Sequence, residues 1–147
     1  MTTATETTLK AEVRAALVAR DSAIGMKDIE GIMRHYADDL VYYDAIPPFQ
    51  SAGAGGLRHG WESCLPYFPE RFGIVSEQLS IHGDGDAAAA NWIWRFTDLP
   101  VDHGAMQTCL RATAILERRE GGWKIVHEHC SVPFDPHTSQ AVFSLEP

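Results

Sequence analysis

Asp44 stands at the end of the aromatic segment "HYADDLVYYDA", residues 35–45, where its carboxylate could transfer protons. A carboxylate in an apolar cavity has a raised pKa, because burial disfavours its charged form, and it can then take and return a proton. Tyr42, Tyr43 and the two prolines at 47 and 48 could supply such surroundings. Alternatively, Asp44 accepts backbone hydrogen bonds where the strand ends. The residues alone favour this second interpretation.

Arg20 interrupts a stripe of apolar residues at helical spacing, between Leu17 and Ile24. The spacing predicts that Arg20 faces inward, where it needs a partner because an unpaired buried charge is unfavourable. That partner could be Asp44 or an anionic ligand. A paired Asp44 would have a lowered pKa and would be a poor base. Alternatively, the Arg20 side chain extends past the helix end to solvent.

Three tryptophans are candidates for an apolar wall. Trp92 and Trp94 alternate in "NWIWRF", so they share one face of a strand with Phe96. Large aromatic side chains suit a flat or cyclic ligand, although plain core packing is the alternative for each of them. Trp61 begins a helical segment and is either core or pocket wall.

The last strand carries a H-x-H pair, His127 and His129, with Glu128 and Cys130 on its other face. Two histidines at this spacing can bind a metal. No third ligand stands at a diagnostic spacing, so we predict neither a metal nor a cofactor, and we expect structural or interface histidines. Glu128 is a second candidate acid, or else a solvated strand residue.

The overall composition excludes several classes of partner. The chain has 147 residues, with 12 basic against 20 acidic side chains and a net charge of -8. Binding to nucleic acid or to an anionic membrane needs an excess of Lys and Arg, so we expect neither. The three cysteines show no disulfide spacing, and no signal peptide is visible. We therefore expect a cytoplasmic protein.

The order of elements predicts an α+β fold, with helices first and an antiparallel meander after them. Helices are expected at 9–24 and from Asp28, and a third, short one from Trp61 to Phe68. The segment 45–60 reads as a long Gly- and Pro-rich loop. Strands are expected at 40–44, 74–82, 87–97, 106–118 and 123–132.

Two stretches, "KDIEGIMRHYADDLVYYD" (27–44) and "REGGWKIVHEHCSVPFD" (119–135), resemble the nuclear-transport-factor-2-like superfamily. This superfamily includes the ketosteroid isomerases and the SnoaL-like polyketide cyclases. The resemblance implies one domain over 1–147, with 1–7 and 136–147 as flexible termini. It further implies a cone, in which a strongly bent antiparallel sheet wraps around three N-terminal helices. A pocket at the open end and a homodimer through the outer sheet face are expected.

The same resemblance implies roles for individual residues. Asp44 matches the general base of the isomerases, and Arg20 stands where they place a tyrosine of the oxyanion hole. Their second donor, an acid, is absent at Thr113 or Ala114, so we do not expect ordinary steroid isomerisation. The implied catalytic residues are Asp44 and Arg20. The implied ligand-binding residues are Tyr42, Trp61, Trp92, Trp94, Glu128 and Cys130.

Three functions remain open from the sequence. The first is an isomerase- or lyase-type acid–base enzyme that acts on a cyclic or polyketide-like molecule, with Asp44 as its base. The second is a protein that binds a small apolar or cyclic molecule without turnover, in which Arg20 holds an anionic group. The third is an assembly module similar to the kinase association domain, in which the sheet face with His127 and His129 matters most.

Overall fold

The first helix, α1, crosses the inner face of the sheet. In the computed structural model, which describes residues 2–147 and the side chains from Thr8 onward apart from Gln107, α1 spans Thr2–Gly25. Its stripe of Leu9, Val13, Leu17 and Ile24 is buried, as the spacing predicts. The helix begins earlier than predicted, because residues 2–7, which the sequence analysis placed in a flexible terminus, continue it. Met1 lies outside the described residues.

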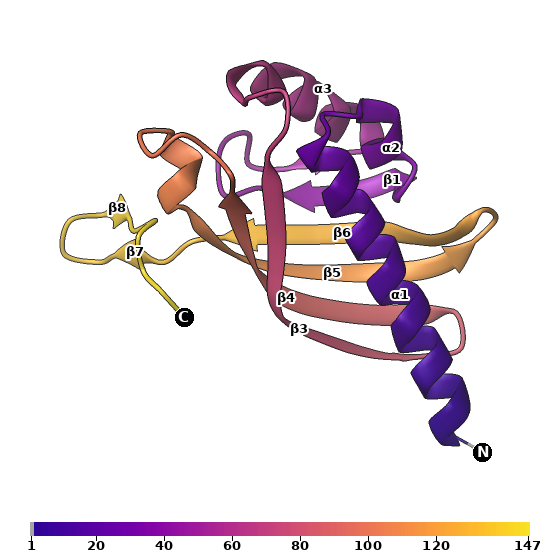
Figure 1. The fold of residues 1–147 in the computed structure, drawn as a ribbon. Coiled ribbons are helices and arrows are strands. Elements are labelled where there is room, and N and C mark those ends of the chain that lie inside the picture. The colour runs from indigo at the N-terminus through magenta and orange to yellow at the C-terminus, as the bar shows by residue number, and fades with distance from the viewer. Residues whose placement is uncertain (1) are drawn as a thin grey trace.

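Two shorter helices lie above β1 (Figure 1). Helix α2 spans Ile29–Met33, and Asp28 caps it by accepting a 2.9 Å hydrogen bond from the Gly31 amide. Helix α3 spans Ala54–Cys64 and continues into the 3-10 turn η1, Leu65–Tyr67. The prediction that 45–60 is a loop is therefore wrong for its second half. The glycines at the start of this helix have low helix propensity, so the sequence does not indicate a helix there. In the structure, burial of Leu57 and Trp61 stabilises the helix.

The main sheet has six strands in the order β2-β1-β6-β5-β4-β3. All neighbours pair antiparallel except β1 and β6, which are parallel, so the sheet is mixed where the predicted one was antiparallel throughout. The strands are β1 Tyr36–Tyr43, β2 Ser51–Ala52, β3 Gly73–Asp84, β4 Ala87–Thr97, β5 Cys109–Arg119 and β6 Gly122–Ser131.

The end of the molecule opposite the N-terminus carries the remaining elements (Figure 1). The 3-10 turn η2, Gly104–Gln107, precedes β5, which is why that strand begins at Cys109 and not at the predicted 106. Strands β7, Phe134–Asp135, and β8, Gln140–Ala141, form a separate hairpin. The C-terminal segment after it is joined to the sheet by ion pairing of Arg95 with Glu146, at 2.8 Å.

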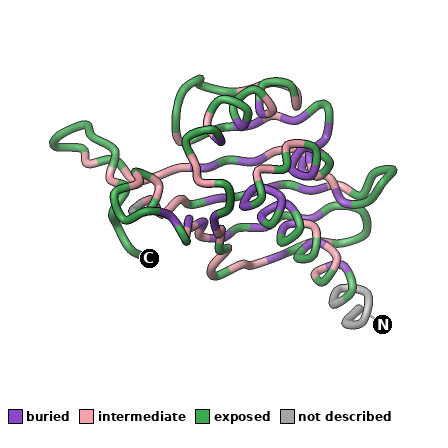
Figure 2. Tube along the Cα trace, turned by 45° about the horizontal axis from the view of Figure 1, so that its top comes forward, coloured by how far each residue is buried: buried purple, intermediate pink, exposed green. Residues whose placement is uncertain are grey.

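The core lies between α1 and the inner face of the sheet, where Figure 2 shows the buried parts of the chain. Strand β4 illustrates the alternation that builds it. Its buried positions are Ala88, Ala90, Trp92, Trp94 and Phe96, and the positions between them face outward. Strand β6 buries Glu128 and Cys130 in the same way, so the carboxylate of Glu128 enters an apolar core.

Candidate functional site

A network of charged and hydroxyl groups is buried where α1 meets β1 and β6. Arg20 Nη1 donates to Glu128 Oε2 at 2.7 Å and to the Tyr36 hydroxyl oxygen at 2.8 Å. The Tyr36 hydroxyl in turn donates to Glu128 Oε1 at 3.0 Å. Arg20 and Glu128 are both fully buried. Helical spacing predicted that Arg20 faces inward, and the family resemblance implied the same for Glu128, but neither indicated that the two residues pair.

Asp21 is the second carboxylate of this network. Its Oδ1 accepts from Arg20 Nε at 2.8 Å, and its Oδ2 accepts from the Ser76 hydroxyl at 2.6 Å. Burial alone would lower the pKa of Arg20, but the groups around it, among them both carboxylates, raise the pKa well above its usual value. Burial raises the pKa of Glu128 above 4.5, although Arg20 and Tyr36 oppose the shift.

The side chains of this network, and the tryptophans beside it that were expected to line an open pocket, are buried. The Arg20 guanidinium carbon lies 4.5 Å from the ring centroid of Trp94 and 5.3 Å from that of Trp92. Both indoles are only 2% exposed, and Cys130 is 1% exposed. The tryptophans, Arg20 and Glu128 are therefore packed in the core of this structure.

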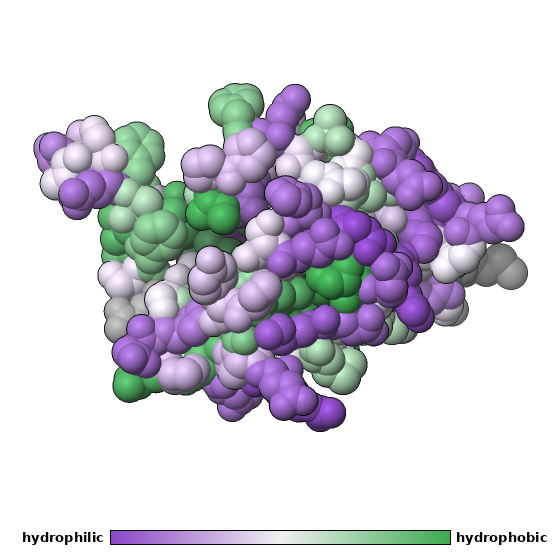
Figure 3. Space-filling model, turned by 90° about the horizontal axis from the view of Figure 1, so that it is seen from above, coloured by the Kyte–Doolittle hydropathy of each residue, from purple (hydrophilic) through white to green (hydrophobic). Residues whose placement is uncertain are grey.

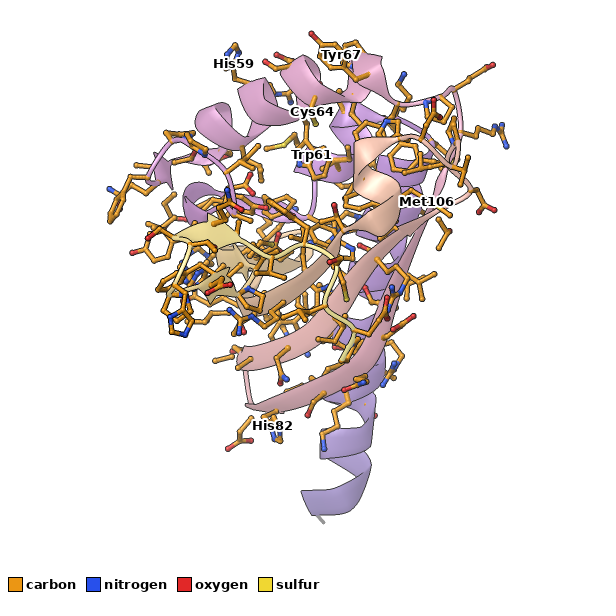
Figure 4. The ribbon with its side chains drawn as sticks, turned by 90° about the vertical axis from the view of Figure 1, so that its left-hand side faces the viewer. His59, Trp61, Cys64, Tyr67, His82 and Met106 are labelled. Atoms are coloured by element: carbon orange, nitrogen blue, oxygen red, sulfur yellow. The ribbon has the colours of Figure 1, made fainter. Side chains whose placement is uncertain are left out.

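Four buried N–H donors in the described part of the chain lack an acceptor. They are Nη2 of Arg20 and the indole Nε1 atoms of Trp61, Trp92 and Trp94. Buried donors are normally paired, so four together mark a core that is short of acceptors. In Figure 4, Trp61 and Cys64 point from α3 toward the interior, whereas His59 and Tyr67 lie on the outer side of this layer.

Asp44 does not pair with Arg20. Its Oδ1 accepts from the Ala45 amide at 2.7 Å, and no cation of the described residues lies within ion-pairing distance of it. The residue is exposed by its surface area, yet loss of solvent around the carboxylate raises its pKa. Backbone hydrogen bonds from Ala45 and Ile46 oppose this shift. Asp44 is therefore both a strand-end acceptor and an unpaired carboxylate.

Asp44 lines a groove of about 630 Å³ at the end of β1, which we call the Asp44 groove. Its other lining residues are Tyr43, Ile46, Pro47, Pro48, Phe49 and His129. Phe49 is 95% exposed, so its apolar ring is open to solvent at this groove. Figure 3, the view from above, shows apolar side chains around a hollow on the side from which the β7–β8 hairpin projects.

Tyr42 and Cys130 lie between Asp44 and the buried network. The Tyr42 hydroxyl donates to Cys130 Sγ at 3.6 Å, and both side chains are buried. Burial chiefly raises the pKa of each, and the negative charges of Glu128 and Asp44 raise both further. Asp44 is thus close enough to the inner side chains of β1 and β6 to act on them electrostatically.

The H-x-H pair faces outward. Nδ1 of His127 donates to the Val41 carbonyl oxygen at 2.8 Å, and the Tyr43 ring meets the rings of His127 and His129 edge-on at 4.9 and 5.6 Å. Among the described residues no group of three His, Cys, Asp or Glu side chains could hold a metal ion. The described helices also include none that is long and apolar enough to cross a membrane.

The network contains residues that the sequence analysis missed. Tyr36 was not a candidate, but it begins β1 and points its hydroxyl at Glu128. Asp21 and Ser76 were not candidates. The only available signal was the acid that directly follows Arg20 in the sequence, and helical periodicity places neighbouring residues on different faces.

Comparison with known proteins agrees with this architecture. Residues 13–135 match the family model of the SnoaL-like domain. An NTF2-like protein of unknown function from Pseudomonas putida KT2440 is 35% identical, with a TM-score of 0.86, over 96% of this chain and 98% of that chain. No curated protein matches.

More distant solved structures share the fold alone. A protein of unknown function from Mycobacterium tuberculosis has a TM-score of 0.75 at 16% identity, over 91% of this chain and 82% of that one. An NTF2-like protein from Cytophaga hutchinsonii ATCC 33406 has a TM-score of 0.67 at 15% identity, over 83% and 96%. The family match covers most of the chain, and the chain belongs to the SnoaL-like domain family, with an NTF2-like cone fold.

Proposed function

We propose that this protein binds a small, flat or cyclic, uncharged molecule in the Asp44 groove and that Asp44 transfers a proton on it, as an isomerase- or lyase-type enzyme. The observation that carries the proposal is the state of Asp44. Its carboxylate has a raised pKa and no cationic partner among the described residues, so its basicity is not suppressed by an ion pair.

The charge state of the site favours an uncharged ligand. Arg20 is the cation that would hold an anionic group, and Glu128 and Asp21 already engage it at 2.7 and 2.8 Å. The groove of about 630 Å³ falls within the usual size range of small-molecule sites. Ile46 and Phe49 supply apolar contacts beside the carboxylate.

Proton transfer is the step that this arrangement supports. Asp44 would take a proton from a carbon next to a carbonyl group and return it to another carbon of the same molecule, or, in an elimination, pass it to a departing hydroxyl group that leaves as water. The residue keeps the same charge before and after the cycle, and the step calls on no metal or organic cofactor.

The test is hydrogen exchange on bound probe compounds, which requires no knowledge of the natural substrate. A series of cyclic ketones and lactones is incubated with the protein in D2O, and loss of α-proton signals is followed by NMR. Asp44→Asn should abolish catalysed exchange while the fold and the binding of the probe, measured by thermal shift, remain. Asp38→Asn, on the same strand, removes the same charge and should exchange as the parent does.

Retained exchange in Asp44→Asn would refute a catalytic role. Binding of the probes without exchange by the parent would instead support the second candidate, a non-catalytic binding protein. The 2.7 Å hydrogen bond from the Ala45 amide to Asp44 favours that candidate, because it gives the carboxylate a structural task.

A further inference from the structure

A second groove lies at the other end of β1, outside the proposed Asp44 site. It has a volume of about 730 Å³ and is bordered by α2, the start of α3 and the turn between β5 and β6. We call it the α2–α3 groove. Its charged and titratable lining consists of Glu30, Arg34, His35, Asp38, Arg58 and Lys124. This groove and the Asp44 groove share no lining residue, so they are separate.

The α2–α3 groove is locally positive in an acidic protein. Three of the 12 basic residues of the chain line it, against two carboxylates, whereas the whole chain carries a net charge of -8. Figure 3 shows hydrophilic side chains gathered at the end of the molecule away from the β7–β8 hairpin, where this groove lies. A positive groove on a negative molecule concentrates small anions and repels cations.

Within the described part of the chain, one of the three cations is paired with a carboxylate and the other two are not. Arg58 holds Glu30 through two hydrogen bonds, of 2.7 and 3.1 Å, which also keep the pKa of Glu30 low. Lys124 donates to the carbonyl oxygen of Arg34, so its ammonium group is fixed at the end of α2. Within the described part of the chain, neither Arg34 nor Lys124 has a carboxylate at ion-pairing distance.

His35 reports the positive field in the groove. Burial, and after it the charges of Arg20, Lys124 and Arg34, together lower its pKa from 6.5 to about 4, against an opposing effect of Asp21. His35 is therefore uncharged at neutral pH. It brings no negative charge into the groove, so it does not repel an anionic ligand. Met33 and Trp123 supply an apolar border beside it.

We propose that the α2–α3 groove binds a small organic monoanion, with its carboxylate on Arg34 and Lys124 and its apolar part toward Met33 and Trp123. The single positive charge in excess matches one negative charge on the ligand. Asp38 and Glu30 on the rim disfavour larger polyanions, because each added negative charge meets two carboxylates. The site is independent of the proton transfer proposed for Asp44.

The experiment uses benzoate as the probe and the intact protein, with inorganic phosphate as a comparison anion. Binding is measured by calorimetry, and the pKa of His35 is followed by NMR titration with and without benzoate. In the parent, benzoate should bind and raise the pKa of His35 above about 4, because the bound carboxylate offsets the part of the lowering that the charges of Lys124 and Arg34 cause.

The double variant Arg34→Gln/Lys124→Gln should weaken benzoate binding by about tenfold or more, since it removes two charge-assisted hydrogen bonds. The single variant Arg111→Gln, an exposed cation on β5, is the control and should bind as the parent does. Circular dichroism verifies that the double variant is folded.

Three results would overturn the proposal: no benzoate binding to the parent, equal binding by the double variant, or binding that leaves the pKa of His35 unchanged. The last would place benzoate elsewhere, for example in the Asp44 groove. Asp44→Asn separates this proposal from the proposed function, because it should leave the His35 response intact. Tighter binding of phosphate than of benzoate would refute the choice of a monoanion.

Discussion

Removal of the Arg20 guanidinium is the most direct test of the buried network. The variant Arg20→Met keeps an unbranched side chain of similar length against the tryptophans and leaves Glu128 and Asp21 without their cation. Arg20 and Glu128 are fully buried and lie 2.7 Å apart, so the uncompensated carboxylate stays in the core. Breaking a buried pair from one side destabilises a protein by about 3–5 kcal/mol.

This loss is a large part of the total free energy of unfolding. A domain of this size unfolds with about 5–15 kcal/mol, and for a chain of about 150 residues each kcal/mol lowers Tm by about 2–4 °C. We therefore expect Arg20→Met to unfold about 6–20 °C below the parent. Chemical denaturation followed by circular dichroism gives the free energy of unfolding, and calorimetry gives Tm.

The double variant Arg20→Met/Glu128→Leu is the matched control. It removes both charges, so it should be more stable than Arg20→Met by about 2 kcal/mol, even though it has lost one more hydrogen-bonding group. A double variant that is less stable than Arg20→Met would show that the Glu128 carboxylate is not the origin of the loss. A loss below about 1 kcal/mol in Arg20→Met would refute the buried ion pair itself, because that is the range of exposed pairs.

The pH dependence of stability gives a second test of the buried ion pair. Burial already raises the pKa of Glu128 above 4.5 in the parent, and loss of Arg20 removes the main opposing influence. A carboxyl group with a raised folded-state pKa binds more protons in the folded than in the unfolded state, so stability falls as pH rises through that range. The deficit of Arg20→Met should therefore be smaller at about pH 5 than at about pH 8.

Two further predictions concern other parts of the molecule. We propose a homodimer through the outer sheet face, on which Ile115 is 45% exposed; Ile115→Asp should convert it to a monomer in light scattering, and a monomeric parent would contradict the dimer. Burial raises the pKa of Cys130, which is 1% exposed, so a thiol reagent should modify Cys64 and Cys109 first and reach Cys130 only after unfolding. Equal rates for all three thiols would contradict that expectation.

Elements with a strong local pattern could be predicted from the sequence. Strand β4 was predicted at 87–97 and is found there, because apolar residues alternate along it and a Gly-Asp turn precedes it. Helix α3 was missed at its start, because its first turn contains Gly55 and Gly56, which have low helix propensity. The parallel pairing of β1 with β6 has no local signature at all, since it joins segments far apart in the chain.

The candidate site, too, could be predicted from the sequence only in part. Periodicity correctly predicted that Arg20 faces inward and that Glu128 and Cys130 share one face of their strand, and the family resemblance implied that this face is the inner one. It could not select the partner of Arg20, because several carboxylates were available and only the three-dimensional arrangement brings Glu128 to 2.7 Å. Asp44, which the sequence offered as that partner, has no ion pair among the described residues.

The pairing of Arg20 with Glu128 and Asp21, and not with Asp44, bears directly on function. Had Arg20 paired with Asp44, one ion pair would have neutralised both the cation and the base. Glu128 and Asp21 engage Arg20 within the core, and that arrangement leaves a carboxylate with a raised pKa at the end of β1, beside apolar side chains. The buried network therefore has a second consequence besides stability, because it keeps the positive charge of Arg20 away from Asp44. Arg20→Met should accordingly change stability far more than it changes the protonation of Asp44.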